Sequence, residues 1–443
     1  MTYSKIHANS PSSATSALDL FSAPITKTSV IEGTDIELGP IGNPSATDID
    51  FSYEASGANY IDGQKTTLHV QCKVTKANGG AIGTGDAQKV FPVTNLLHTL
   101  FSTIQLSYGS HLITYADNYP YVAYFENLLN SGEGSKRSTD QAHMWIYDDT
   151  GVIDTSDLKD EHKSDINKRK VLIDNGKTID LFGTLNLSLL MQERYLPPGA
   201  PIKLRLTRSS DAFCLMRSDA ADGTNYKISI SKCCLNLRQV TIHPGIVTAH
   251  NSLLSAGKSM LYPMNKVEAQ TFAISNGQQN ARLSIVVNRQ RPKRMFIGFV
   301  DHQARNGDIT RDPFNFQHFD ISSIVLDVDG FPNPSKPIQC DFDGNCFTKA
   351  FYNLGKVAQK SNIDFDHGIS RDMFKTGYAI FAFDLTPDEC NGEGVHLIRN
   401  QSVSLEVAFK KPLPKTISAV VFSELDDLLQ IREDRSISRL STI

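Results

Sequence analysis

An aromatic helix is predicted by the stretch Asn118-Tyr119-Pro120-Tyr121-Val122-Ala123-Tyr124-Phe125-Glu126-Asn127-Leu128-Leu129. A long polar loop follows it, and then a predicted strand over 183–189 that opens on a glycine. The second half of the chain repeats this order. A helix is predicted by Asn345-Cys346-Phe347-Thr348-Lys349-Ala350-Phe351-Tyr352-Asn353-Leu354, a polar loop follows, and a strand over 377–383 again opens on a glycine. The two halves share few identical residues but the same order of elements, which predicts two copies of one β domain.

Strand patterns dominate both halves, because apolar and polar residues alternate with the period of a half-buried strand. In the first half the predicted strands include 25–38, 66–74, 100–108 and 226–244. In the second half they begin at 261 and include 282–287, 294–300, 319–328, 338–342, 378–383, 395–409 and 416–422. Many strands with few and short helices predict an all-β chain of two tandem eight-stranded jelly-roll sandwiches, a double jelly roll.

A chain of 443 residues is long enough for two domains of ordinary size. We expect a flexible N-terminal arm over 1–24, a first jelly roll over 25–244 and a linker over 245–260 that is extended or forms a short helix. A second jelly roll is expected over 261–422 and a C-terminal tail over 423–443, which continues the last strand or forms a short helix. The polar stretch 130–170 is long for a connection within a compact domain and predicts a projecting surface loop.

Charge and cysteine content exclude several classes of protein. A net charge of −4 and a pI near 6.3 argue against a protein that coats nucleic acid, because neutralising phosphates requires a basic face. The seven cysteines are odd in number and irregularly spaced, which predicts buried free thiols in a reducing compartment. No signal peptide or membrane span is predicted. We therefore expect synthesis in the cytosol and no sequence-specific nucleic-acid binding.

No nucleophile elbow, phosphate-binding loop or dinucleotide fingerprint is present in the sequence, and we predict no catalytic, cofactor or metal site. Asp301, His302 and the segment 318–320 have the residue types of a metal or acid–base cluster, although ordinary surface hydrogen bonding explains them as well. Asp341 begins a segment that resembles a calcium loop, but the twelfth position is Tyr352 in place of glutamate. A turn that caps the next helix is the favoured interpretation.

Three other patterns have a chemical and a structural interpretation. Adjacent Cys233 and Cys234 point to opposite faces of a strand, which favours core packing over joint metal binding. The basic segment 289–294 suits a nuclear address or a nucleic-acid contact, and a charged turn between two strands is the alternative. Aromatic side chains at helical spacing can stack on bases but favour the core; these are Tyr119, Tyr121, Tyr124 and Phe125.

Three segments carry a family resemblance. They are Gly377-Tyr378-Ala379-Ile380-Phe381-Ala382-Phe383-Asp384-Leu385-Thr386-Pro387-Asp388, the pair 319–322 and 326–330, and Tyr195-Leu196-Pro197-Pro198-Gly199. The chain resembles, from about 24 to 422, the major capsid proteins of Maverick/Polinton elements and the related adintoviruses. The resemblance implies a double jelly roll whose strands stand upright on the capsid floor. It also implies a homotrimer, a pseudo-hexameric capsomer that tiles an icosahedral shell.

The resemblance carries further expectations about partners and place. Neighbouring capsomers and a single jelly-roll penton protein at the vertices are the implied partners, and the virion is the implied location, after synthesis in the host cytosol and assembly in the nucleus. The loops 131–170 and 355–375 would form outward towers or contacts around the trimer axis. The arm and the tail would tie neighbours together at the base.

A structural capsid protein without enzymatic activity is therefore the expected function. One alternative is a carbohydrate-binding or glycan-processing β-sandwich, which requires a concave patch with paired carboxylates or exposed aromatic rings; the single tryptophan, Trp145, falls in the polar stretch. A minor vertex capsid protein is a second alternative, although such proteins usually resemble one jelly roll and this chain predicts two.

Overall fold

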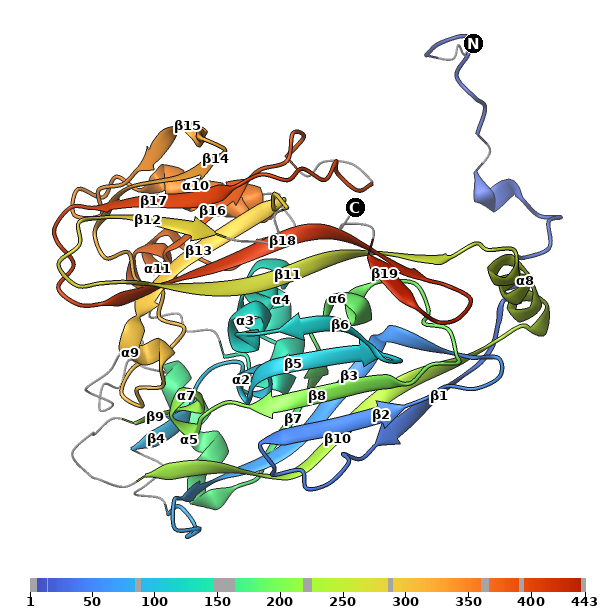
Figure 1. Cartoon of the computed structure of the whole chain (residues 1–443), viewed down its shortest axis with the longest axis horizontal. Helices are drawn as coiled ribbons and strands as arrows, with labels where there is room; N and C mark the ends of the chain where they lie inside the picture. The colour runs from blue at the N-terminus through green and yellow to red at the C-terminus, as the bar shows by residue number, and fades with distance from the viewer. Residues whose placement is uncertain are drawn as a thin grey trace.

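The computed structural model describes residues 6–13, 15–83, 89–146, 164–217, 225–285, 290–359, 366–389 and 394–439. Its strands form four four- or five-stranded antiparallel sheets, two in each half of the chain (Figure 1). A small pair of strands, β4 (Val90–Pro92) and β9 (Leu215–Arg217), lies apart from them.

The first half pairs its strands in the orders β1-β10-β3-β7 and β2-β8-β5-β6. The bounds are β1 (Val30–Leu38), β2 (Asp48–Tyr53), β3 (Asn59–Lys76), β5 (Phe101–Tyr108), β6 (His111–Ala116), β7 (Ile179–Thr184), β8 (Ile202–Arg208) and β10 (Tyr226–Ile242). The second half has the orders β11-β18-β13-β16 and β12-β17-β14-β15, and β19 (Ile437–Arg439) pairs with β18. The bounds are β11 (Met260–Ile274), β12 (Asn280–Ile285), β13 (Arg294–Asp301), β14 (Ile321–Val328), β15 (Phe331–Gln339), β16 (Ile380–Asp384), β17 (Val403–Phe409) and β18 (Ile417–Ile431).

The two halves are topological copies of each other. In each half eight strands build the two large sheets. The first, eighth, third and sixth strands form one sheet, and the second, seventh, fourth and fifth strands form the other. The fifth and sixth of these strands are separated in each half by a helical connection, which contains α3 (Tyr119–Asn130) in the first half and α10 (Thr348–Val357) in the second. The fold is therefore a double jelly roll, and the repeat predicted from the sequence is confirmed.

One predicted strand is wrong. Residues 183–189 do not form a strand, because β7 ends at Thr184 and α6 covers Ser188–Met191. The leucines Leu185, Leu187 and Leu189 are all buried, and a short run of buried leucines has no periodicity that separates a strand from a buried helix. The equivalence of β7 and β16 in the two halves is nevertheless correct.

The projecting loop predicted over 130–170 is also wrong for its described part. Residues 131–146 and 164–170 are largely helical, with α4 (Glu133–Lys136), η2 (Thr139–His143) and α5 (Ser164–Ile173); residues 147–163 lie outside the described residues. Lys136 is buried, and its Nζ donates hydrogen bonds to the backbone carbonyls of Leu128 (2.7 Å) and His367 (2.8 Å). The polar composition of this stretch therefore does not mean that all of it is exposed. Lys136 can be buried because backbone carbonyls accept the hydrogen bonds of its ammonium group.

The linker and the tail are both regular. The linker is the helix α8 (Pro244–Ser255), which lies beside the end of the N-terminal arm, where the chain enters β1 (Figure 1). β18 continues past 422 to Ile431, as the first of the two predicted tail conformations requires. The remaining helices are η1 (Ser16–Leu18), α2 (Leu96–Thr99), η3 (Asp174–Gly176), α7 (Asp211–Cys214), α9 (His302–Arg305) and α11 (Arg371–Thr376). None of the described helices is long and apolar enough to cross a membrane.

The two cores are shared at their boundary. β11 and β18 are long strands whose ends reach the first half, where Tyr262, Met264, Leu429 and Ile431 join its hydrophobic core. In the opposite direction, α3 contributes Tyr121, Tyr124 and Phe125 to the core of the second half. Each half therefore buries residues of the other in its core.

Candidate functional site: the interface of the two jelly rolls

Aromatic rings of α3 join the two halves. The ring of Tyr124 stacks on Phe314 with centroids 4.5 Å apart and planes 5° from parallel. Phe125 stacks on Phe422 of β18 at 5.3 Å and 18°. Trp145 is also buried, with its ring centroid 5.1 Å from that of Tyr124. The core interpretation of these rings is therefore confirmed, and Trp145 offers no exposed stacking surface to a sugar.

A buried charge network lies beside these rings. Arg294 of β13 forms an ion pair with Glu424 of β18 at 2.6 Å, and both side chains are largely buried. Glu126 of α3 is buried nearby and accepts a hydrogen bond from the Asn130 amide. Burial, and next the negative charge of Glu424, raise the pKa of Glu126 to about 7. Glu126 therefore stays protonated over much of the range in which an exposed glutamate is ionised.

A cleft of about 730 Å³ opens between the halves beside this network. Glu126, Arg194, Asn265 and Arg294 are among the residues that line it. A carboxyl group with a pKa near 7 suits general acid–base chemistry, but such chemistry also needs a reacting partner. The other carboxylates that line the cleft are Glu193, Glu424 and Asp426. Glu424 pairs with Arg294, and Asp426 pairs with Lys293 at 2.7 Å.

Asp301 and His302 do not form the metal cluster that was one interpretation of the sequence. The Asp301 carboxylate is buried and pairs with Arg311 and with Lys415 (2.5 Å). Despite its burial, the Lys415 hydrogen bond and the nearby charges lower the pKa of Asp301. His302 Nδ1 shares a hydrogen bond with the Ser418 hydroxyl at 2.9 Å. Within the described parts of the chain, no group of three or more metal-ligating side chains comes together.

His318 and Asp341 also have structural roles. The ring of His318 stacks on Phe342 at 4.0 Å and 9°, and burial lowers its pKa. The Asp341 carboxylate accepts a hydrogen bond from the backbone N–H of Gly344 at 3.2 Å and pairs with Lys410 at 3.1 Å. The turn is confirmed, but the prediction that it caps the next helix is wrong, because the N-cap of α10 is Phe347 and no side chain caps that helix.

The described part of the basic segment, 290–294, leads into β13: residues 290–293 precede the strand and Arg294 is its first residue, while Arg289 lies outside the described residues. Lys293 pairs with Asp426 at 2.7 Å, and Arg294 pairs with Glu424. These two cations point to carboxylates of the same chain and are not free to contact phosphate.

The cysteines follow the expectation with one exception. Cys233 and Cys234 are successive residues of β10, and both are buried free thiols. Burial raises the pKa of the Cys72 and Cys233 thiols to about 12. Cys346, however, is exposed, so the prediction of a buried thiol is wrong at this position; Cys390 lies outside the described residues.

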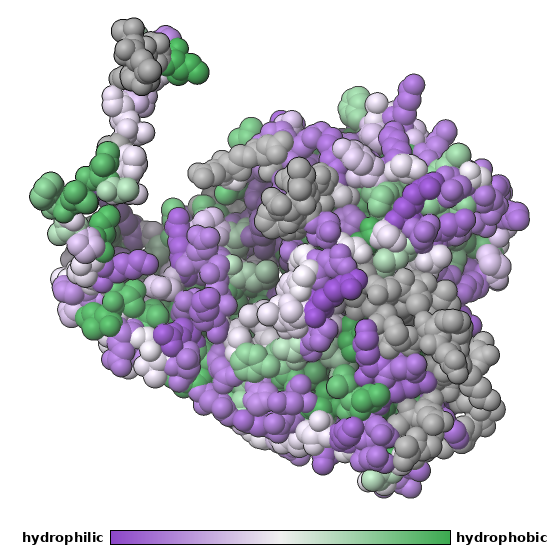
Figure 2. Space-filling view, turned by 180° about the vertical axis from the view of Figure 1, so that it is seen from behind, coloured by the Kyte–Doolittle hydropathy of each residue, from purple (hydrophilic) through white to green (hydrophobic). Residues whose placement is uncertain are grey.

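Sequence reasoning missed an apolar N-terminal arm. The arm extends away from the body (Figures 1 and 2), and Leu18, Leu20, Phe21 and Ile25 are between 70% and 100% exposed. Large apolar side chains in a row on an exposed segment are characteristic of an interaction surface. The sequence signal was the apolar run Leu18-Asp19-Leu20-Phe21 within an otherwise small and polar segment.

An apolar cavity of about 490 Å³ lies where the arm joins the body. Tyr60, Ile242, Ile246 and Tyr262 line it, and the Tyr60 hydroxyl shares a hydrogen bond with Nδ1 of His250 on α8 at 3.0 Å. The exposed apolar side chains of the arm and the apolar side chains that line this cavity therefore lie at the same end of the molecule.

Solved structures with the same fold match nearly the whole length of the chain. The chain is similar to a chain of the Sputnik virophage structure, with a TM-score of 0.65 and 13% identity over 99% of this chain and 94% of that one. The Faustovirus major capsid protein matches with a TM-score of 0.56 and 9% identity, covering 92% of each chain. The mavirus major capsid protein matches with a TM-score of 0.52 and 10% identity, covering 99% and 96%. The structural neighbours are capsid proteins of viruses, not enzymes.

A sequence relative extends the comparison to animals. An uncharacterized protein of Caenorhabditis elegans is 26% identical over 382 residues, which cover 84% of this chain and 88% of the relative. No protein-family model matches the chain.

Proposed function

We propose that the chain is the major capsid protein of an icosahedral particle and that three copies form a pseudo-hexameric capsomer. The observation that carries this proposal is the duplicated jelly roll locked into one unit by a shared core. Three such units provide six similar sandwiches around a three-fold axis, which gives a near-hexagonal outline from a single kind of subunit. The likeness to viral capsid proteins over nearly the whole chain supports it.

The finer assignment is to Maverick/Polinton elements or adintoviruses. It is supported by the sequence resemblance and by a relative that occurs in an animal. In this proposal the functional units are the jelly rolls at 25–244 and from 261 to the end of β18, with α8 as the linker and the chain ends as ties between neighbours. A single jelly-roll penton protein closes the vertices, and particles assemble in the nucleus after synthesis in the cytosol. Catalytic, cofactor and metal sites play no part.

The mass of the purified full-length chain in solution tests the capsomer. One chain has a mass of 48.9 kDa, so light scattering should give three times this value, about 147 kDa. A species that stays at the mass of one chain at high concentration and under all assembly conditions would count against the capsomer.

A further inference from the structure

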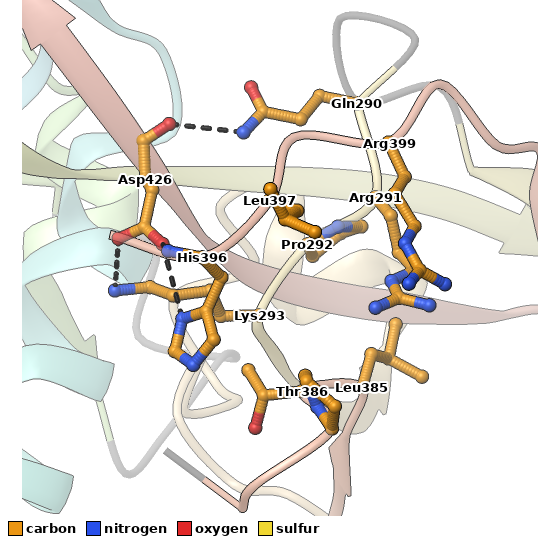
Figure 3. Close-up of a pocket in the computed structure, with 11 residues that line it drawn as sticks. Gln290, Arg291, Pro292, Lys293, Leu385, Thr386, His396, Leu397, Arg399 and Asp426 are labelled. Carbon is orange, nitrogen blue, oxygen red and sulfur yellow. Dashed lines mark hydrogen bonds and ion pairs between the residues drawn. The ribbon is translucent and has the colours of Figure 1, made fainter. Parts of the chain in front are cut away.

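Two arginines share one pocket in the second half. The pocket, of about 60 Å³, lies between the β12–β13 turn and the β16–β17 loop (Figure 3). Arg291 and Arg399 line it, and the two backbones are joined by a hydrogen bond from Arg291 N–H to the Arg399 carbonyl at 2.9 Å. A volume of this size admits a small group such as a carboxylate, since one water needs about 10–15 Å³ on the same measure.

The pocket holds an excess of positive charge. Arg291 donates a hydrogen bond to the neutral Gln401 amide at 3.1 Å. Among the described residues, neither Arg291 nor Arg399 forms an ion pair with a carboxylate, whereas the adjacent Lys293 and His396 both contact Asp426 (Figure 3). Burial and the neighbouring Arg399 charge lower the pKa of Arg291. An anion between the two guanidinium groups would relieve this repulsion.

Exposed apolar side chains border the arginine pair. Val395, Leu397 and Ile398 of the β16–β17 loop are 53%, 83% and 43% exposed. We call Arg291, Val395, Leu397, Ile398 and Arg399 the arginine surface. Its chemistry fits a short segment that carries a carboxylate among large apolar side chains.

The N-terminal arm contains such a segment. In Leu18-Asp19-Leu20-Phe21 one carboxylate stands among three apolar side chains that are 70%, 76% and 99% exposed. Asp19 Oδ1 accepts a hydrogen bond from the Ser22 backbone N–H at 3.2 Å, and η1 precedes it, so the segment is locally turned. Both its charge and its apolar character complement the arginine surface.

We propose that the segment Leu18–Phe21 of one copy docks on the arginine surface of a second copy, with the Asp19 carboxylate between Arg291 and Arg399. A second copy is the occupant because the arm stands away from its own body, with these side chains uncovered (Figure 2). Leu20 and Phe21 then cover Leu397 and its apolar neighbours. The inference rests on the proposed capsid function, because it requires many copies in one assembly.

Peptide binding tests the chemistry. A fluorescent peptide of residues 15–26 is titrated with full-length chain whose own arm carries Asp19→Arg. We expect Arg399→Asp in that chain to weaken binding at least tenfold, whereas Lys336→Ala, which removes an exposed cation on β15, leaves it unchanged. An Asp19→Asn peptide should also bind at least tenfold more weakly, and an Asp19→Arg peptide should regain affinity for the Arg399→Asp chain. Equal binding of the wild-type and Asp19→Asn peptides would overturn the proposal.

Disulfide trapping tests whether the contact joins two copies. One chain carries Asp19→Cys and another carries Leu397→Cys, both with the exposed Cys346 replaced by serine. A disulfide-linked pair in the mixture is expected, and a bond that forms only when both cysteines are on one chain would overturn docking between copies. Light scattering of the wild-type and Arg399→Asp chains separates the two proposals. If the Arg399→Asp chain is a trimer that has lost peptide binding, both proposals are supported; if it is a trimer with undiminished binding, only the docking is overturned. A wild-type chain that is monomeric overturns the capsomer.

Discussion

Replacing the buried Glu126 by glutamine should remove a loss of stability that the wild-type chain suffers as the pH rises. Glutamine imitates the protonated glutamate in shape and charge, and its carbonyl can accept the hydrogen bond that Asn130 donates to Glu126. The substitution therefore removes the ionisation while it preserves the packing at the boundary of the two jelly rolls.

The magnitude follows from the pKa of Glu126, which rises from 4.5 in solvent to about 7 in the folded chain. Below pH 4.5 the folded and unfolded chains both hold the proton. Between pH 4.5 and 7 only the folded chain holds it, so the free energy of unfolding falls with pH. At about 1.4 kcal/mol per unit, the full loss is about 3 kcal/mol. The variant should match the wild type near pH 4.5 and exceed its stability by about this amount above pH 7.

Urea denaturation at pH 5 and pH 8 measures the difference, with the fluorescence of Trp145 as the signal. Trp145 is the only tryptophan and is buried beside Tyr124 at the boundary of the halves, so it reports on this region directly. Comparing variant and wild type at each pH cancels the other titrating groups. The exposed Glu32→Gln serves as the control and should show no such difference. Equal pH dependence in Glu126→Gln and wild type would refute the reasoning.

Two further predictions concern packing and thiol reactivity. Gly298→Ala should lower the free energy of unfolding by about 1–3 kcal/mol, because a Cβ at this position overlaps the buried ring of Phe316; the control Gly39→Ala meets open space, and equal urea midpoints for both would contradict the packing. Cys346 should react with iodoacetamide at pH 8 within minutes, while Cys72, whose pKa burial raises to about 12, should stay unmodified until the chain unfolds. Mass spectrometry of digested protein would reveal a contrary result as early labelling of Cys72.

The sequence predicts the repeated architecture because the pattern is local. Alternating side chains in β3, β5 and β10 report one buried face directly, and the order of helix and strand around α3 and α10 reveals the duplication. The segment 183–189 fails because its leucines are buried on all sides. Some residues of one half are buried in the core of the other, such as Tyr262 of β11 in the first core. These contacts join segments that are distant in the sequence, so a local sequence pattern does not predict them.

The candidate site was predicted less completely than the fold. The aromatic spacing of α3 predicts a buried face, which the stacking of Tyr124 on Phe314 confirms. Glu126 on the same helix gives no sign of its burial, because a single carboxylate on a helix ordinarily faces solvent. The arm was interpreted only as mobile, since three apolar side chains around Asp19 do not form a periodic pattern.

Electron microscopy of the purified full-length chain tests the capsid proposal most directly. We predict particles with a near-hexagonal outline and three-fold symmetry, in which the two jelly rolls of each copy alternate around the axis. Under assembly conditions these should associate into closed shells. Isolated single-copy particles that never associate, at any concentration or ionic strength, would contradict the account.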